Sequence, residues 1–345
     1  MNVTILYNPV AGRGKAAAAA HRLAADLSRD AHTVELRDTG PAALKRSHDA
    51  ALPGTDAMIV VGGDGSVHAA ADLARRSGAP VYQFPMGTEN LFAREFGMDR
   101  TYATLARALE RRRIVPIDMG DCNGRSFLLM CSVGLDANVV HRLARVRTGA
   151  ITHFSYARHL LLEAIRPDTP RLTIRVDGRT LVDGRDGLVV VANSRQYAFR
   201  LNPARHADMT DGLLDGIFIP CRSPLAMTAW ATRLRLQDVS QARGIVYFRG
   251  TRIRIEAEPR PIPRAGAARL SDAAVYQLDG EAPGISYDRD SGPATTPLEI
   301  TVRPSAMLVL SPRALATPAL DRSGVPTVDV RQPPTCPVAG SAGSA

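Results

Sequence analysis

The first third of the chain alternates short apolar segments with segments of helical pattern, and this alternation restricts the fold strongly. A strand, a helix and a further strand in this order predict parallel strands, because a helical crossover carries the chain back to begin the next one. Turns at the carboxyl ends of such strands lie at one edge of the sheet, where ligands bind. The sequence predicts strands at 3–7, 33–36, 57–61, 80–84 and 114–119, and helices at 15–28, 42–51, 68–76 and 102–111.

From about residue 121 the pattern changes to closely spaced strands with few helices. This spacing predicts a predominantly antiparallel β-sandwich. We therefore expect an α/β domain over 1–120, a β-sandwich domain over 121–313, and a disordered tail over 314–345, which is rich in Pro, Ala, Gly and Ser. The expected strands are 126–132, 171–176, 188–193, 214–219, 243–248, 252–256, 274–278 and 298–302, and the expected helices are 136–145, 153–165 and 224–236.

The chain of 345 residues has a formal net charge of +9, carried almost entirely by arginine. A basic surface suits a nucleotide, a nucleic acid or an acidic membrane, although a general arginine bias explains the charge as well. Nucleic acid is the weakest of these partners, because no nucleic-acid-binding motif is present. No apolar run reaches the length of a membrane span, and the N-terminus has the pattern of a strand, so we expect a cytoplasmic protein. The four cysteines lack the spacing of a zinc site or a disulfide framework.

Residues 60–66 (VVGGDGS) are an apolar strand that ends in a glycine turn with one carboxylate. Glycines leave backbone amides accessible to phosphate oxygens, and a helix that follows from Ser66 would add its positive end. Asp64 beside phosphates is unfavourable unless a metal ion or a substrate hydroxyl lies between them. The turn indicates phosphoryl chemistry, with a plain strand–turn–helix as the alternative.

Two further glycine turns follow strands. Residues 8–15 (NPVAGRGK) offer amides and cationic side chains to phosphates, but they lack the spacing of a P-loop, and no Rossmann-type glycine motif is present. In residues 85–90 (PMGTEN), Gly87 and Thr88 can contact a phosphate, while Asn90 can cap a helix or orient a ligand.

Three acidic positions are candidates for site chemistry. Asp118 lies where the alternation of strands and helices gives way to closely spaced strands. It is either a site residue or part of a linker turn. Residues 208–215 (DMTDGLLD) carry closely spaced oxygens that suit a hard divalent cation, or they close a hairpin through Asp-Gly. Asp279 and Glu281 (LDGE) follow a strand, again with a hairpin as the alternative.

In order and spacing, these motifs resemble the diacylglycerol kinase catalytic family, which includes bacterial lipid kinases and the sphingosine and ceramide kinases. The resemblance runs from about residue 3 to about residue 310 and includes SVGLDA at 132–137 and VAN at 191–193. It implies an α/β domain and a β-sandwich that flank a nucleotide cleft between them. It also implies a kinase that depends on ATP and Mg²⁺ and phosphorylates a hydroxyl of diacylglycerol, a sphingoid base, ceramide or another glycerolipid.

The resemblance implies roles for individual residues. Glu281 would accept the proton of the lipid hydroxyl, with Asp279 beside it. Asp64 and Asp118 would support magnesium and the phosphate geometry, which is most of what phosphoryl transfer needs. Magnesium would be bound by the Asp211 side chain and by the backbone carbonyls of Asp208 and Leu213. The expected ATP-binding residues are Asn8, Pro9, Gly12, Arg13, Gly62, Gly63, Asp64, Gly65, Ser66, His68, Gly87, Thr88 and Asn90.

Two positions depart from the family pattern. Leu91 replaces an aspartate that many members have, and His68-Ala69 replaces Asn-Glu. The lost carboxylates leave open a catalytically weak nucleotide- or lipid-binding protein on the same fold. An enzyme similar to NAD kinase is a third hypothesis, because NAD kinases resemble this family in fold and share a Gly-Gly-Asp-Gly turn. The retained Asp64, Asp279 and Glu281 favour an active enzyme, and the Gly-Thr-x-Asn and Leu-Asp-Gly-Glu motifs favour the lipid branch.

A lipid substrate implies peripheral contact with an anionic membrane at its inner surface. Residues 141–147 and 156–162 mix cationic and apolar side chains at helical spacing. These segments would rest on the bilayer or line the lipid pocket, or they are ordinary packed helices with a basic face. The oligomeric state is left open, with a homodimer as one alternative.

Overall fold

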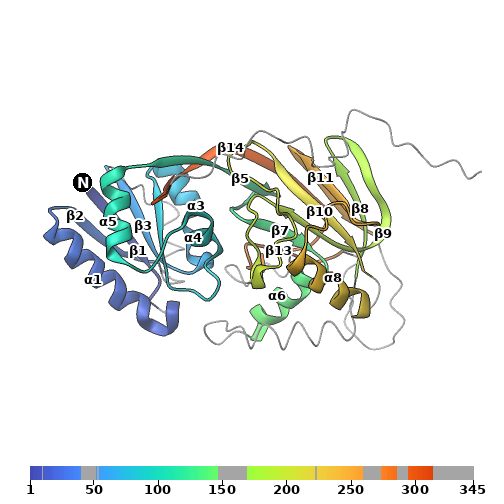
Figure 1. Ribbon diagram of the computed structural model, residues 1–345, viewed down its shortest axis with the longest axis horizontal. Coiled ribbons are helices and arrows are strands. Elements are labelled where there is room, and N and C mark those ends of the chain that lie inside the picture. The colour runs from blue at the N-terminus through green and yellow to red at the C-terminus, as the bar shows by residue number, and fades with distance from the viewer. Residues whose placement is uncertain are drawn as a thin grey trace, which may run out of the picture.

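The computed structural model describes residues 1–9, 11–39, 52, 54–146, 169–221, 224–258, 273–285 and 294–313. An α/β domain and a mainly β domain lie side by side and are joined by long strands (Figure 1). The helices expected at 42–51 and 153–165 and the tail expected over 314–345 lie outside the described residues. The same holds for the cationic segment 156–162.

The first domain confirms the expected alternation of strands and helices. Its strands pair in parallel in the order β4-β3-β1-β2. All six residues of β3 are buried, as expected for a central parallel strand covered on both faces. The elements are β1 (Asn2–Tyr7), η1 (Ala11–Gly14), α1 (Lys15–Arg29), β2 (Thr33–Asp38), β3 (Ala57–Gly62), α3 (Asp64–Ser77), β4 (Val81–Pro85), α4 (Leu91–Phe96) and α5 (Tyr102–Arg111).

Helix α3 begins earlier than the sequence pattern predicts. The expected boundary lay at residues 66–68, but the helix begins at Asp64, with Gly63 in an extended conformation as its N-cap. The Gly-Gly-Asp-Gly segment therefore contains the N-cap and the first residues of the helix, and it does not form a separate turn before it. The helix ends at Ser77 and is followed by Gly78 as its C-cap, whose φ of 68° is left-handed and suits glycine.

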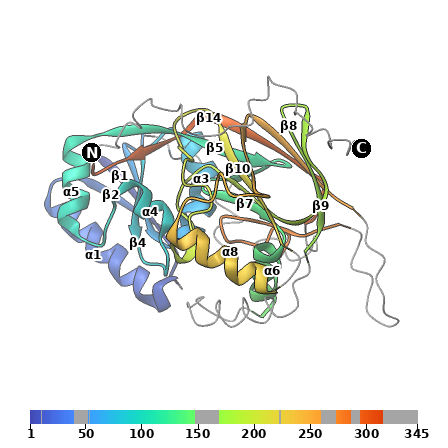
Figure 2. The same ribbon diagram turned by 45° about the vertical axis from the view of Figure 1, so that its right-hand side comes forward.

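The second domain confirms the antiparallel β-sandwich. Inward-facing apolar side chains of its strands form one buried cluster, which includes Ile174, Val191, Phe218 and Phe248. Helices α6 and α8 lie on the same side of this domain (Figure 2). Its elements are β6 (Arg125–Phe127), β7 (Met130–Val133), α6 (Leu135–Val146), β8 (Arg171–Val176), β9 (Arg179–Ala192), η2 (Ala198–Arg200), β10 (Leu214–Pro220), α8 (Pro224–Leu236), β11 (Val246–Gly250), β12 (Arg252–Ala257) and β13 (Tyr276–Leu278).

The single strand expected at 126–132 is wrong. Strand β6 ends at Phe127 and β7 begins at Met130, so residues 128 and 129 interrupt the strand. The physical reason is a side chain from elsewhere: the amides of Leu128, Leu129 and Met130 all donate to the carboxylate of Asp279.

Two long strands run through both domains. Strand β5 (Ile114–Cys122) pairs antiparallel with β14 (Leu298–Leu310), with a register shift between Arg303 and Met307. The first part of β14 pairs with β12, and Val309 near its end pairs with Val81 of β4. The chain thus returns to the strands of the first domain at the end of its described part. The expected domain boundary at residue 120 stays a prediction.

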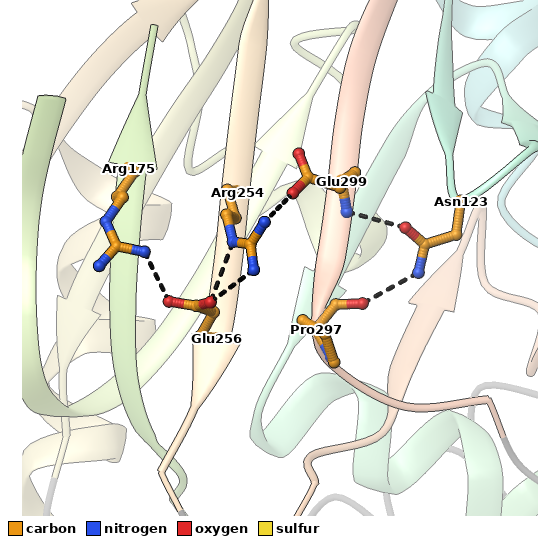
Figure 3. Close-up of polar contacts among 6 residues, drawn as sticks. All are labelled: Asn123, Arg175, Arg254, Glu256, Pro297 and Glu299. Carbon is orange, nitrogen blue, oxygen red and sulfur yellow. Dashed lines mark hydrogen bonds and ion pairs between the residues drawn. The ribbon is translucent and has the colours of Figure 1, made fainter. Parts of the chain in front are cut away.

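The outer face of the second domain carries a chain of ion pairs across three strands (Figure 3). Arg175 of β8 and Arg254 of β12 are directly opposite in register, which is unfavourable for like charges. Glu256 lies between them, 2.7 Å from Arg175 and 2.8 Å from Arg254, and Glu299 contacts Arg254 from the other side. This face is therefore solvated, whereas the opposite face of the same strands forms the core.

Candidate active site

The three glycine turns meet at the carboxyl edge of the parallel sheet, as the sequence predicts. A Cβ atom added at Gly87 would lie 2.7 Å from the Cα of Gly63, and one added at Gly12 would lie 3.1 Å from the carbonyl oxygen of Met86. The backbones therefore approach as closely as only glycine allows. The other predicted residues of this edge are Asn8 and Pro9 after β1, Arg13 in η1, Ser66 in the first turn of α3, and Thr88 after β4.

Gly87→Ala tests this close approach. Gly87 does not have a positive φ, so the effect of the added methyl group is steric. The methyl group would lie 2.7 Å from the Cα of Gly63 and 2.9 Å from the Oδ1 of Asn90. We expect the free energy of unfolding, measured by urea denaturation, to fall by about 2 kcal/mol. Gly63→Ala is the control, because its Cβ would lie 3.1 Å from Gly87, and it should cost less. Equal losses in both variants would contradict the packing described here.

Asp64 joins two of the glycine motifs. Its Oδ1 accepts a hydrogen bond from the amide of Phe92 at 3.0 Å, so the carboxylate satisfies the N-terminus of the short helix α4. Burial raises the pKa of the Asp64 carboxyl to about 6, although amide hydrogen bonds from Leu91 and Phe92 act in the opposite direction. A carboxyl group with such a pKa at a glycine-lined edge is typical of a functional site.

The side chain of Asn90 closes its own turn. Its Oδ1 accepts from the Gly87 amide and its Nδ2 donates to the Gly87 carbonyl, both at 2.8 Å, and it does not cap helix α4. Arg100 donates to the carbonyls of Pro85 (2.7 Å) and Gly87 (3.2 Å) and so supports the same turn. No sequence signal distinguishes Arg100, because its contacts depend on the folding of the chain after α4.

Asp279 is the most fully hydrogen-bonded of the predicted site residues. Its Oδ1 accepts from the amides of Leu129 (2.7 Å) and Met130 (2.9 Å), and its Oδ2 accepts from the amide of Leu128 at 2.8 Å. The same Oδ2 lies 2.8 Å from the Nδ1 of His68, which belongs to helix α3 of the first domain. The structure therefore brings the Gly-Gly-Asp-Gly helix and the Leu-Asp-Gly-Glu turn together across the two domains.

The turn that carries Glu281 is supported by Gln277, which sequence reasoning missed. The Gly280 amide donates to Gln277 Oε1 at 2.7 Å, and Gln277 Nε2 donates to Ser132 Oγ at 2.8 Å. Ser132 in turn donates to Asp136 at 2.7 Å, as Tyr197 does at 2.6 Å. The SVGLDA segment thus contacts the Glu281 turn through side chains.

Asp118 is buried in β5 and is not in a linker turn. Its oxygens accept from the amides of Gly212 (2.7 Å) and Ser305 (2.8 Å), and Asn193 donates to its carbonyl at 2.8 Å. Burial raises the pKa of the Asp118 carboxyl, although the hydrogen bonds from the backbone amides of Ser305 and Gly212 act in the opposite direction. The hydrogen bonds described for its carboxylate go to the loop before β10 and to β14, and none goes to the glycine turns.

The loop at 208–213 does not fit the expected magnesium ion. Asp211 Oδ1 accepts from the amide of Leu213 at 3.0 Å, and its Oδ2 is bound by the guanidinium of Arg249, which is itself mostly buried. Asp208 Oδ1 accepts from the amide and the hydroxyl of Thr210. An arginine therefore neutralises the carboxylate that would bind the cation.

Comparison with known proteins agrees with this fold. A family model described as the diacylglycerol kinase catalytic domain matches residues 2–122. A second, described as the YegS C-terminal NAD kinase beta sandwich-like domain, matches residues 130–311. The fold and the site thus define a two-domain kinase.

Relatives specify the family. The chain is 30% identical over 324 residues to a diacylglycerol kinase of Mycobacterium tuberculosis, with 90% of this chain and 95% of the relative covered. It is 32% identical over 184 residues to a YegS-like protein of Pseudomonas aeruginosa, with 50% of this chain and 57% of the relative covered. A crystal structure of a diacylglycerol kinase from Bacillus anthracis superposes with a TM-score of 0.61 at 19% identity, with 90% and 96% covered. The chain belongs to the diacylglycerol kinase family, and it is a lipid kinase.

Proposed function

We propose that this lipid kinase transfers the γ-phosphoryl group of ATP to a hydroxyl of diacylglycerol or a related lipid. The observation that carries the proposal is the contact of His68 with Asp279 at 2.8 Å, which joins the glycine-rich edge to the Leu-Asp-Gly-Glu turn. Groups suited to a phosphate donor and to a hydroxyl acceptor thereby lie on the two sides of one domain interface.

The glycine-rich edge suits the triphosphate. Backbone amides at the start of α3 and in the turns of Gly12 and Gly87 can donate to phosphate oxygens, and the α3 N-terminus adds a partial positive charge. A divalent cation enters as part of the ATP complex, and it supplies charge neutralisation on the phosphates. Asp64 is the carboxylate at this edge, where it can orient that complex.

Glu281 suits the acceptor side. In the proposed step the lipid hydroxyl gives its proton to Glu281 while its oxygen forms a bond to the γ-phosphorus. The bond from the γ-phosphorus to the β,γ-bridging oxygen breaks, and ADP leaves with that electron pair. Asp279, bound by backbone amides, positions the turn on which Glu281 lies.

Peripheral membrane contact is part of the proposal. No helix among the described residues is both long and apolar enough to cross a bilayer. A basic chain of net charge +9 is expected to bind anionic vesicles through electrostatic attraction, which salt weakens. Vesicle co-sedimentation at low and high salt measures this, and binding that never occurs, or that salt leaves unchanged, would contradict it.

Labelled ATP with Mg²⁺ and mixed micelles of diacylglycerol, sphingosine, ceramide or monoacylglycerol tests the function, with NAD as a non-lipid acceptor. We expect transfer to at least one lipid, and a loss of at least about a hundredfold in Glu281→Gln. Glu258→Gln is the control, because Glu258 forms an exposed pair with Arg171 on the outer face, and it should retain activity. Faster transfer to NAD than to any lipid, or full activity of Glu281→Gln, would overturn the proposal.

A further inference from the structure

One face of helix α3 docks on the second domain. His68 Nδ1 lies 2.8 Å from Asp279 Oδ2, and Asp72 Oδ1 accepts from Ser126 Oγ of β6 at 3.0 Å. These α3 residues are four apart, so they lie on the same side of the helix. The helix that begins at Asp64 is therefore fixed against the second domain by two polar contacts.

The contact of His68 differs from an ordinary surface pair. The Asp279 side chain is 2% exposed and that of His68 is 15% exposed. Three backbone amides of the second domain already fix the Asp279 carboxylate, so His68 meets a rigid partner. A charged hydrogen bond shielded from water is stronger than the same bond at the surface. The placement of α3 beside the turn 279–281 therefore depends on this bond.

The charges around the imidazole favour its protonated form. Burial lowers the pKa of His68, but the carboxylates around it act in the opposite direction, Asp279 most strongly through its hydrogen bond and charge, and the pKa is raised. The other charged groups that act on it are Glu281, from the same turn as Asp279, and Asp72, from α3 itself. All three neighbours are carboxylates, so His68 keeps its proton to a higher pH than an exposed histidine does.

We propose that His68 is a positioning residue that holds the two domains together and sets the turn of Asp279 and Glu281 beside the first turn of α3. Its protonation makes this arrangement dependent on pH. The stabilisation is fully present below the ordinary histidine pKa, and it is lost as the pH rises through the raised value, because a neutral imidazole forms only a weaker hydrogen bond. The effect on catalysis rests on the proposed function, whereas the effect on stability does not.

His68→Gln tests the proposal, because glutamine keeps a hydrogen-bond donor but has no charge. The matched control is His206→Gln: His206 Nε2 lies 2.6 Å from Asp238, but both side chains are at least a third exposed and lie in one domain. We would measure the melting temperature of the full chain from pH 6 to 9, kcat/KM over the same range, and the imidazole titration by NMR.

In the wild type we expect the melting temperature and kcat/KM to fall together as the pH rises, kcat/KM by about tenfold. His68→Gln should show the lower values already at neutral pH and should lack this alkaline fall, while His206→Gln follows the wild type. An alkaline fall unchanged in His68→Gln, or an NMR titration of His68 at or below the ordinary pKa, would overturn the proposal.

Two results separate this proposal from the proposed function. If no variant phosphorylates a lipid, the proposed function fails, and the melting temperatures and the NMR titration still decide the role of His68. If His68→Gln does not fold, His68→Asn and the titration of the wild-type imidazole give the decision.

Discussion

Asp279→Asn is expected to abolish lipid phosphorylation and to lower the free energy of unfolding by about 4 kcal/mol. The carboxylate of Asp279 accepts hydrogen bonds from three backbone amides and lies 2.8 Å from His68. An asparagine has one acceptor oxygen, and its NH₂ group would face donors. At least one buried amide would then lose its partner, which is the costly case for a hydrogen bond.

Urea denaturation and the kinase assay measure the two effects of Asp279→Asn. Asp177→Asn is a close control, because Asp177 also has a positive φ (46°, against 52° for Asp279). Its carboxylate accepts from the amides of Thr251 and Arg252, but in an exposed hairpin away from the site. The control should lose some stability and keep its activity. An Asp279→Asn enzyme with wild-type activity would show that the carboxylate does not position Glu281.

Arg249→Met is expected to lower the free energy of unfolding by about 3 kcal/mol, because it leaves buried carboxylates without their cation. Arg249 binds Asp211, and its Nε lies 3.1 Å from Asp215. These two carboxylate side chains are 4% and 1% exposed, so water cannot replace the guanidinium. Arg254→Met on the exposed outer face is the control and should cost little.

The effect of magnesium on the melting temperature is a second measurement on Arg249→Met. If the guanidinium takes the place of a bound cation, millimolar MgCl₂ without nucleotide should raise the melting temperature of Arg249→Met but not that of the wild type. Stabilisation of the wild type by MgCl₂ to the same extent would contradict this, and it would restore the expected magnesium site at Asp208, Asp211 and Leu213.

The sequence predicted the fold well where short-range pattern decides it. Bounds for α5 (102–111), β8 (171–176) and α8 (224–236) agree with the expected ones residue for residue. Prediction failed where a distant side chain changes the backbone. The strand expected at 126–132 is interrupted because Asp279 binds its amides. Other bounds missed without such a contact: α3 begins at Asp64 rather than after Gly65, and β11 begins at Val246 rather than at residue 243.

The candidate site shows the same division. The sequence indicated Asp64, Asp279 and Glu281 as site residues. It also predicted that the glycine turns lie at one edge of the sheet, because the carboxyl ends of parallel strands lie at the same edge. It did not reveal Arg249, which lies opposite Asp215 in the pairing of β10 and β11. It also did not reveal the support of the site by Arg100 and Gln277.

The sequence by itself determined the two-domain architecture and the order of the phosphate-binding and acidic motifs. These follow from hydrophobic periodicity and from glycine and carboxylate chemistry, which are local properties of the chain. Only the tertiary structure decided which partner each carboxylate takes: Asp279 pairs with His68 across 211 positions, and Asp211 pairs with Arg249. The physical reason is that such pairs form only when packing brings distant strands and helices within hydrogen-bonding distance, and no local pattern encodes that distance.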